Sequence, residues 1–205
     1  AGFRNLSGLV TEARLGQERG RPGITFEQLA ARAEGLHALT GPASGPVAAL
    51  MAEGRLLEAR LLLDRWRELF GEHLALEVQL HHVSGEEAEL AEALIELAGR
   101  TGIPWVASNE PRYLDADGRR VHDFLTALRA GVDDEAALRN GLRLPNGEWR
   151  LKSPREMAVL WQGREAGLEE SMRIAEGCRF SLRWLRAPLP SFPTRAGQRE
   201  AAFPR

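Results

Sequence analysis

Short β-like runs alternate with helical stretches in the first half of the chain, and this alternation constrains the fold more than any other feature. The runs are residues 36–40, 74–80 and 103–108. Between them, apolar residues recur at helical spacing, so the expected order is strand, helix, strand, helix, strand. Strands that alternate with helices form parallel sheets, and we therefore expect an α/β domain.

Capping residues and glycines predict where the first helices begin and end. Ser44 follows the first strand and is expected to cap the next helix, with proline in its first turn. Gly54 is expected to divide the helical stretch that follows, because the apolar spacing restarts after it. The pattern over 86–98 predicts another helix, which Gly99 or Gly102 can end.

The second half of the chain has a different texture. A helix is expected over 121–128, a polar stretch over 131–140 and a helix from about 165 to 177. The prolines of 188–193 exclude helix and favour an extended run. A capping box with proline at the first helical position starts one more helix, whose expected buried residues are Met157, Leu160 and Trp161; the box is Ser153-Pro154-Arg155-Glu156.

Composition excludes several classes of protein. The chain has 205 residues, of which 43% are hydrophobic and 27% charged, as in ordinary globular domains. A net charge of −2 gives no basic excess that would indicate nucleic-acid binding. No apolar run is long enough for a membrane span or a signal peptide, so we expect a cytoplasmic protein with no membrane partner. The single cysteine, Cys178, is expected to be buried and inert.

Candidate functional residues follow the second and third strands. His81 and His82 come after the run 74–80, and Glu110 follows 103–108. Functional groups in α/β folds collect at the carboxyl ends of strands, although an exposed histidine pair and a simple Glu110–Arg112 ion pair explain the same residues. A metal site usually needs at least three ligands, and the positive charge of Arg112 opposes a cation there. Arg112 could instead bind phosphate.

Several passages resemble the PHP (polymerase and histidinol phosphatase) region of bacterial C-family DNA polymerases, the alpha subunits of DNA polymerase III, with the error-prone branch nearest. Leu76-Glu-Val-Gln-Leu-His81 is similar to the family's Leu-Glu-x-Gln-x-His. Ala107-Ser-Asn-Glu-Pro-Arg-Tyr-Leu114 is similar to its Ala-Thr-Asn-Asp-x-His-Tyr-Leu. The resemblance runs from Gly2 to Pro193, and its other passages are Gly2–Leu6, Gly35–Gly41, Leu151–Met157, Glu176–Leu182 and Leu189–Pro193.

The departures from the family pattern concern its metal ligands. Pro42 stands where the resemblance implies a cysteine ligand, Glu110 where it implies aspartate, and Arg112 where it implies histidine. His81 alone is unchanged among the ligand positions present. Proline offers no side-chain donor and arginine brings a repelling charge, so His81 and Glu110 are expected only as remnants of a lost metal site.

The resemblance implies a fold and a domain organisation. It implies roughly the second half of a distorted βα-barrel of PHP type over residues 1–145, a helical connector toward an absent polymerase palm over 146–193, and a tail over 194–205. Half a barrel would leave an exposed sheet edge. The chain is thus expected to be an internal piece of a longer polymerase, or a truncated copy of one.

The expected function is a catalytically silent, structural segment of an error-prone DNA polymerase III alpha subunit. No catalytic residue is expected in these 205, and no cofactor, while the parent polymerase would use Mg²⁺ held elsewhere. The expected partners are the rest of the polymerase chain, DNA through the parent enzyme, and other replication or repair subunits. The alternatives are a metal-dependent phosphoesterase or exonuclease using His81, His82 and Glu110, and a stand-alone module in which Arg112 binds phosphate or nucleic acid.

Overall fold

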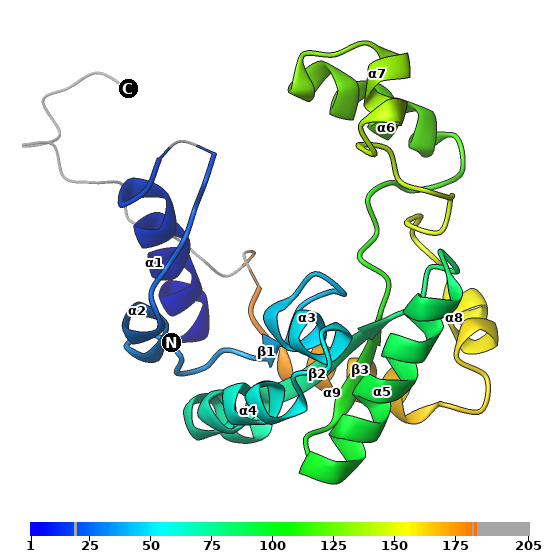
Figure 1. Ribbon diagram of the computed structural model, residues 1–205. Coiled ribbons are helices and arrows are strands. Elements are labelled where there is room, and N and C mark those ends of the chain that lie inside the picture. Colours follow the sequence, from blue (N-terminus) through cyan, green and yellow to red (C-terminus); the bar gives the residue numbers. More distant parts are fainter. Residues whose placement is uncertain (19, 182, 184–205) are drawn as a thin grey trace, which may run out of the picture.

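The computed structural model describes residues 1–18, 20–181 and 183 (Figure 1). Helices of the first half surround a small sheet, and helices of the second half extend from it and return to it. The elements in chain order are α1 (Gly2–Leu15), α2 (Phe26–Ala30), β1 (Ala38–Leu39), α3 (Pro46–Ala52), α4 (Leu56–Phe70), a 3₁₀ turn (Gly71–His73), β2 (Leu74–Gln79), α5 (Gly85–Thr101), β3 (Trp105–Ser108), α6 (Gly118–Ala130), α7 (Asp134–Arg139), α8 (Pro154–Leu160) and α9 (Ala166–Gly177).

The three strands form one parallel sheet in the order β1-β2-β3, which confirms the expected α/β class. Leu76 of β2 pairs with Trp105 of β3, and Ala38 of β1 pairs with Leu74. Four of the six residues of β2 are buried, as expected for the central strand of a covered parallel sheet. The strands described here leave β1 and β3 as edges, and the expected barrel remains a prediction.

Most of the predicted boundaries in this part are confirmed. Gly54 separates α3 from α4 with a left-handed φ of 74°, a conformation that glycine adopts at no steric cost. Gly102, with φ 66°, ends α5, rather than Gly99. The predicted cap at Ser44 is wrong: Gly45 is the N-cap of α3 and offers no side-chain hydrogen bond, while proline occupies the first turn.

Helices cover both faces of the sheet. The helices α3, α4 and α5 lie together in front of it in Figure 1, and α9 lies behind. Gly167 in α9 lets the helix backbone approach the Trp105 ring of β3, since a Cβ at this position would overlap that ring. Trp161, only 1% exposed, packs at 5.3 Å from Trp105 between ring centroids. The second half of the chain therefore completes the hydrophobic core of the first.

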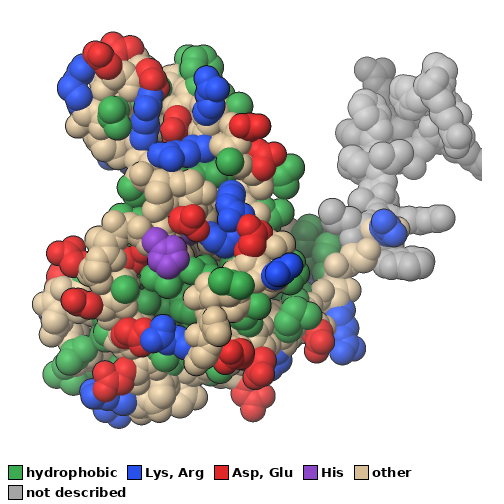
Figure 2. Space-filling view, turned by 90° about the vertical axis from the view of Figure 1, so that its right-hand side faces the viewer, with side chains coloured by type: hydrophobic (Ala, Val, Ile, Leu, Met, Phe, Trp, Pro, Cys, Tyr) green, Lys and Arg blue, Asp and Glu red, His purple; other side chains and the backbone are tan. Residues whose placement is uncertain are grey.

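The α6–α7 hairpin lies apart from the sheet and forms the top of the molecule in Figure 1. Figure 2 shows this hairpin as an upper lobe joined to the main body by a narrower neck. The stretch 131–140 is more ordered than its polar composition indicates, because it contains α7. The Asp133 carboxylate caps α7 by accepting a hydrogen bond from the Ala136 N–H at 2.7 Å.

The capping box at the start of α8 is confirmed: Ser153 and Glu156 bond reciprocally, and proline stands at the first helical position. The expected buried role of Cys178 is wrong, because the residue lies exposed just after α9. The predicted extended run 188–193 and tail 194–205 lie outside the described residues. In the part of the chain that the structure describes, every helix is too short or too polar to cross a membrane.

The pair of His37 and His73 predicts how the stability of the fold depends on pH. The His37 and His73 rings meet edge to face at 4.5 Å. The pKa of His37 is lowered from its ordinary value of 6.5, chiefly because burial disfavours the charged ring, with smaller lowering by His73 and Arg173 and opposition from Glu170. As the pH falls through the unfolded-state pKa, the unfolded chain binds the proton first, so the folded state loses stability.

We therefore expect the denaturation midpoint in urea to be lower at about pH 5 than at about pH 8. His37→Phe, which keeps an aromatic ring but cannot titrate, should lose part of this difference. An equal pH dependence in wild type and variant would contradict the assignment to His37.

Candidate functional site at the carboxyl edge of the sheet

The carboxyl ends of β2 and β3 meet at one edge of the sheet, as the parallel topology requires. His81 and Asn109, which follow these strands, are 3% and 7% exposed and lie against each other. The imidazole Nε2 of His81 is 3.1 Å from the Asn109 carbonyl oxygen. His82 and Glu110 next to them have left-handed φ angles of 54° and 41°, conformations that L-residues seldom adopt. Sharp, strained turns thus lead away from both strands.

The His81 ring is held on three sides. Its Nδ1 lies 3.3 Å from the Glu87 carboxylate, and its face stacks on the Trp149 ring at 4.0 Å with 7° between the planes. The Glu87 carboxylate also accepts hydrogen bonds from the backbone N–H groups of His81 and Val83. A carbonyl oxygen can only accept, so the Nε2 bonded to Asn109 carries the hydrogen. In this arrangement both ring nitrogens of His81 face protein oxygens.

Glu110, the second predicted ligand, does not share a bonding partner with His81. Its carboxylate pairs with the guanidinium of Arg112, as the simpler interpretation expects. The backbone N–H of Arg112 donates to the Trp149 carbonyl oxygen at 2.7 Å. No group of three or more His, Cys, Asp or Glu side chains lies close enough to hold a metal ion within residues 1–18, 20–181 and 183. His81 and Glu110 thus bond to different partners, and their assignment as metal ligands stays a prediction.

Sequence reasoning missed the residue at the centre of this edge, Lys152. Its side chain is 4% exposed, and its ammonium lies 2.7 Å from the Asn109 Oδ1. It also donates to the Glu148 carbonyl oxygen at 2.5 Å and lies 3.0 Å from the Glu148 carboxylate. One sequence signal was present: Lys152 is the only lysine among 27 basic residues. Burial with three oxygen partners gives this ammonium a structural role that a solvated cation lacks.

The segment from Asn146 to Lys152 closes over the strand ends through further bonds. The Asn146 amide donates to the His81 carbonyl oxygen at 2.6 Å. The Asn109 amide donates to the Glu148 and Arg150 carbonyl oxygens at 3.1 and 2.7 Å. Backbone groups of the segment are thus paired with side chains that follow β2 and β3. We call the set His81, Asn109, Asn146, Glu148, Trp149 and Lys152 the edge network.

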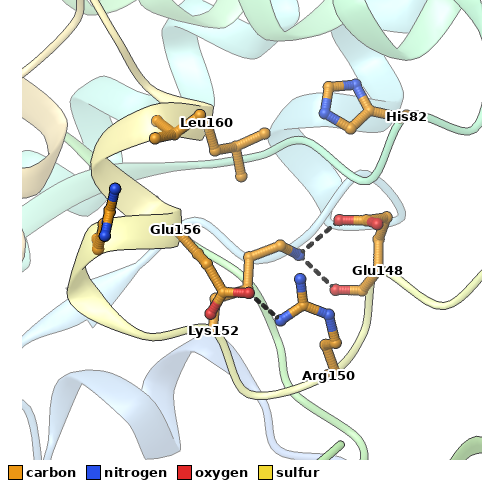
Figure 3. A pocket seen from close by; sticks show the side chains of 8 residues that line it. His82, Glu148, Arg150, Lys152, Glu156 and Leu160 are labelled. Atoms are coloured by element: carbon orange, nitrogen blue, oxygen red, sulfur yellow. Dashed lines mark hydrogen bonds and ion pairs between the residues drawn. The ribbon is translucent and has the colours of Figure 1, made fainter. Parts of the chain in front are cut away.

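An open pocket of about 360 Å³ adjoins the edge network, between His82 and the first turns of α8. Figure 3 shows the Lys152 ammonium directed at Glu148 and the Arg150 guanidinium at Glu156, with His82 on the opposite rim from Arg150. The Arg150–Glu156 pair measures 2.6 Å. On the face drawn in Figure 2, acidic and basic side chains likewise gather beside a histidine. The charged side chains of the pocket largely neutralise one another.

The acids of the pocket are held ionised. The pKa of Glu156 is lowered to about 2, first by hydrogen bonds from the Ser153 backbone and side chain and then by Arg150. The pKa of Glu148 is lowered chiefly by the hydrogen bond from Lys152. Glu156 is therefore ionised near neutral pH and cannot act as a general acid there. Both acids of the pocket are held in ion pairs.

Part of the chain matches a known domain family. Residues 1–81 match the family model of the PHP domain. This part of the chain is therefore similar to PHP domains.

Its relatives are polymerases. The chain is 31% identical over 199 residues to the DNA polymerase III subunit alpha of Pseudomonas aeruginosa, covering 96% of this chain and 16% of that protein. It is 36% identical over 203 residues to the error-prone DNA polymerase of Anaeromyxobacter dehalogenans, with 92% and 16% covered. It is also 36% identical over 191 residues to the error-prone DNA polymerase of Pseudomonas fluorescens, covering 92% of this chain and 17% of that protein. The chain is homologous, over nearly its whole length, to one segment of these polymerases.

Proposed function

We propose that this chain is a catalytically silent PHP segment that braces an error-prone DNA polymerase III alpha subunit. The homology to polymerases of both names supports the parent enzyme, and the chain spans only 16–17% of the length of these three relatives. Template-directed DNA synthesis with Mg²⁺ would use residues outside these 205. The proposed fold is a partial βα-barrel over 1–145, a connector over 146–193 and a tail.

The observation that carries the silent assignment is the bonding of His81. Both of its ring nitrogens face protein oxygens, and the ring stacks on Trp149. A histidine that binds a metal keeps one nitrogen unprotonated and directed at the ion. The ion pair between Glu110 and Arg112 supports the same proposal, because it occupies the second remaining ligand candidate.

The edge network supports the bracing role. It joins the ends of β2 and β3 to the segment that leads into α8, and α8 and α9 then return to the sheet. A network of polar groups whose hydrogen bonds are satisfied holds the segments it joins in one arrangement. In the parent, this arrangement would set how the connector leaves the sheet. The rest of the polymerase chain, DNA bound by the parent, and other replication or repair subunits are the proposed partners, in the cytoplasm.

Metal analysis of the purified protein, combined with hydrolysis of a chromogenic phosphodiester, tests the silent assignment. We expect no stoichiometric zinc or manganese, and a rate with added metal that His81→Ala leaves unchanged. Bound metal at one or more equivalents, with turnover that His81→Ala abolishes, would instead establish the phosphoesterase or exonuclease alternative. A variant at an exposed position, Arg155→Ala, serves as the matched control for handling losses.

The phosphate-binding alternative has a separate test. Arg112, its candidate residue, is paired with Glu110, which weakens an anion site there. Binding to single-stranded DNA that falls steeply with added salt, and is lost in Arg112→Ala, would favour this alternative. We expect no such Arg112-dependent binding.

A further inference from the structure

The outer face of α6 exposes an apolar stripe at helical spacing. Val121, Phe124, Leu125 and Leu128 are 59%, 63%, 54% and 64% exposed. Their spacing of i, i+3, i+4 and i+7 places all four side chains on one side of the helix. The buried residue of α6 is Ala127, which lies on another side of the helix from the stripe. Four large apolar side chains in contiguous positions are more than the isolated exposed leucines of ordinary surfaces.

The stripe borders a groove rather than a flat surface. The groove has a volume of about 690 Å³, and its walls combine α6 with the chain before it and the chain after α7. A helix laid along α6 would enter this groove with its own apolar side chains. The residues that line the groove include Tyr113, Val121, Leu125, Arg129, Leu142 and Leu144.

Two arginines select the charge of the occupant. By helical geometry, Arg120 and Arg129 lie on opposite sides of the stripe and near its two ends. Neither has a carboxylate within ion-pair distance among the described residues, unlike Arg119, which lies 3.8 Å from Asp123. Asp123, the acidic residue of α6, lies on the side of the helix away from the stripe, so a second copy of α6 would offer these arginines no carboxylate. A helix with Asp or Glu beside its apolar stripe would satisfy both cations.

We infer that the α6 groove is the docking site for an acid-flanked amphipathic helix from the remainder of the polymerase chain. The inference rests on the proposed function, because it takes the occupant from the parent protein. Most of each relative's length lies outside the segment that this chain matches, so the parent has ample chain to supply such a helix. Docking buries the stripe and gives the hairpin a partner other than the sheet.

Photo-cross-linking in the gene product that carries this sequence tests the inference. Benzoylphenylalanine in place of Phe124 keeps an aromatic ring in the stripe, and the same group at the exposed Ala130, on the opposite side of α6, is the control. We expect a cross-link from position 124, absent at 130, to an amphipathic helix of the same chain outside residues 1–205. The double variant Arg120→Glu/Arg129→Glu should lose this cross-link, whereas Arg120→Lys/Arg129→Lys should retain it.

A cross-link to a separate protein or to a second copy would overturn the inference. So would equal yields at 124 and 130, or a cross-link that survives the charge reversal. Unchanged circular dichroism in the arginine variants shows that their folding is intact. Metal content and phosphodiester hydrolysis of the same preparation report on the proposed function separately: metal-dependent turnover overturns that function and leaves the docking result in place.

Discussion

Lys152→Met is expected to lower the free energy of unfolding by about 3 kcal/mol, because it leaves buried partners of the ammonium unsatisfied. The Lys152 side chain is 4% exposed and bonds to Asn109 and to both the carbonyl and carboxylate of Glu148. Methionine keeps the length and apolar stem but offers no donor. Urea denaturation monitored by tryptophan fluorescence measures the change, and a loss of this size is a large part of an ordinary domain's stability.

Two companion variants separate the bonding of Lys152 from its charge. Lys152→Arg preserves the charge, but its planar fork is larger than an ammonium, so we expect an intermediate loss. Arg155→Met removes a cation three residues along the chain, where the side chain is exposed and has no ion pair in the described part of the molecule. This change should stay within about 0.5 kcal/mol. Equal effects of Lys152→Met and Arg155→Met would contradict a structural edge network.

Trp161→Ala is expected to cost about 3–5 kcal/mol, the range for removing a large aromatic side chain from a core. Trp161 is 1% exposed and packs beside Trp105, against which α9 makes its close approach at Gly167. The cavity would lie between the sheet and the returning helices, so α9 should lose protection in hydrogen exchange before the strands do. The midpoint of thermal or urea unfolding gives the magnitude.

Trp161→Phe is the matched control for packing. The indole Nε1–H of Trp161 is buried and has no hydrogen-bond partner among the described residues. Phenylalanine removes this unsatisfied donor while keeping most of the apolar volume, so its cost should be well below that of alanine. Similar losses for the two substitutions would show that the site depends on the indole rather than on filled volume.

Local patterns predicted the elements well because their causes are local. The alternation of strand and helix periods specified a parallel sheet, and glycines at 54 and 102 and the capping box at Ser153 marked helix ends. Errors arose where a local signal had a competitor. Gly45 rather than Ser44 caps α3, and an aspartate cap at position 133 stabilises a helix in a stretch of polar composition.

The candidate site was only partly predictable. The strand pattern predicted that His81, Glu110 and Arg112 follow the carboxyl ends of two strands, and the Glu110–Arg112 ion pair is present there. The partners of His81 could not be predicted, since Trp149 and Asn146 come from a segment more than 60 residues away along the chain. The type of residue at a strand end indicates which reactions or ligands it can serve. Its bonding partners in the folded structure decide which of these roles it can take.

The sequence by itself indicated an α/β fold and a resemblance to the PHP region of polymerases, because periodicity and motifs are properties of neighbouring residues. Only the tertiary structure decided that the carboxyl edge is closed by Lys152, which bonds to Asn109 across 43 residues, and that the apolar stripe of α6 faces outward. Both outcomes depend on which distant segments pack together. Hydrogen bonds and burial across such separations are set by the fold as a whole, and no local pattern records them.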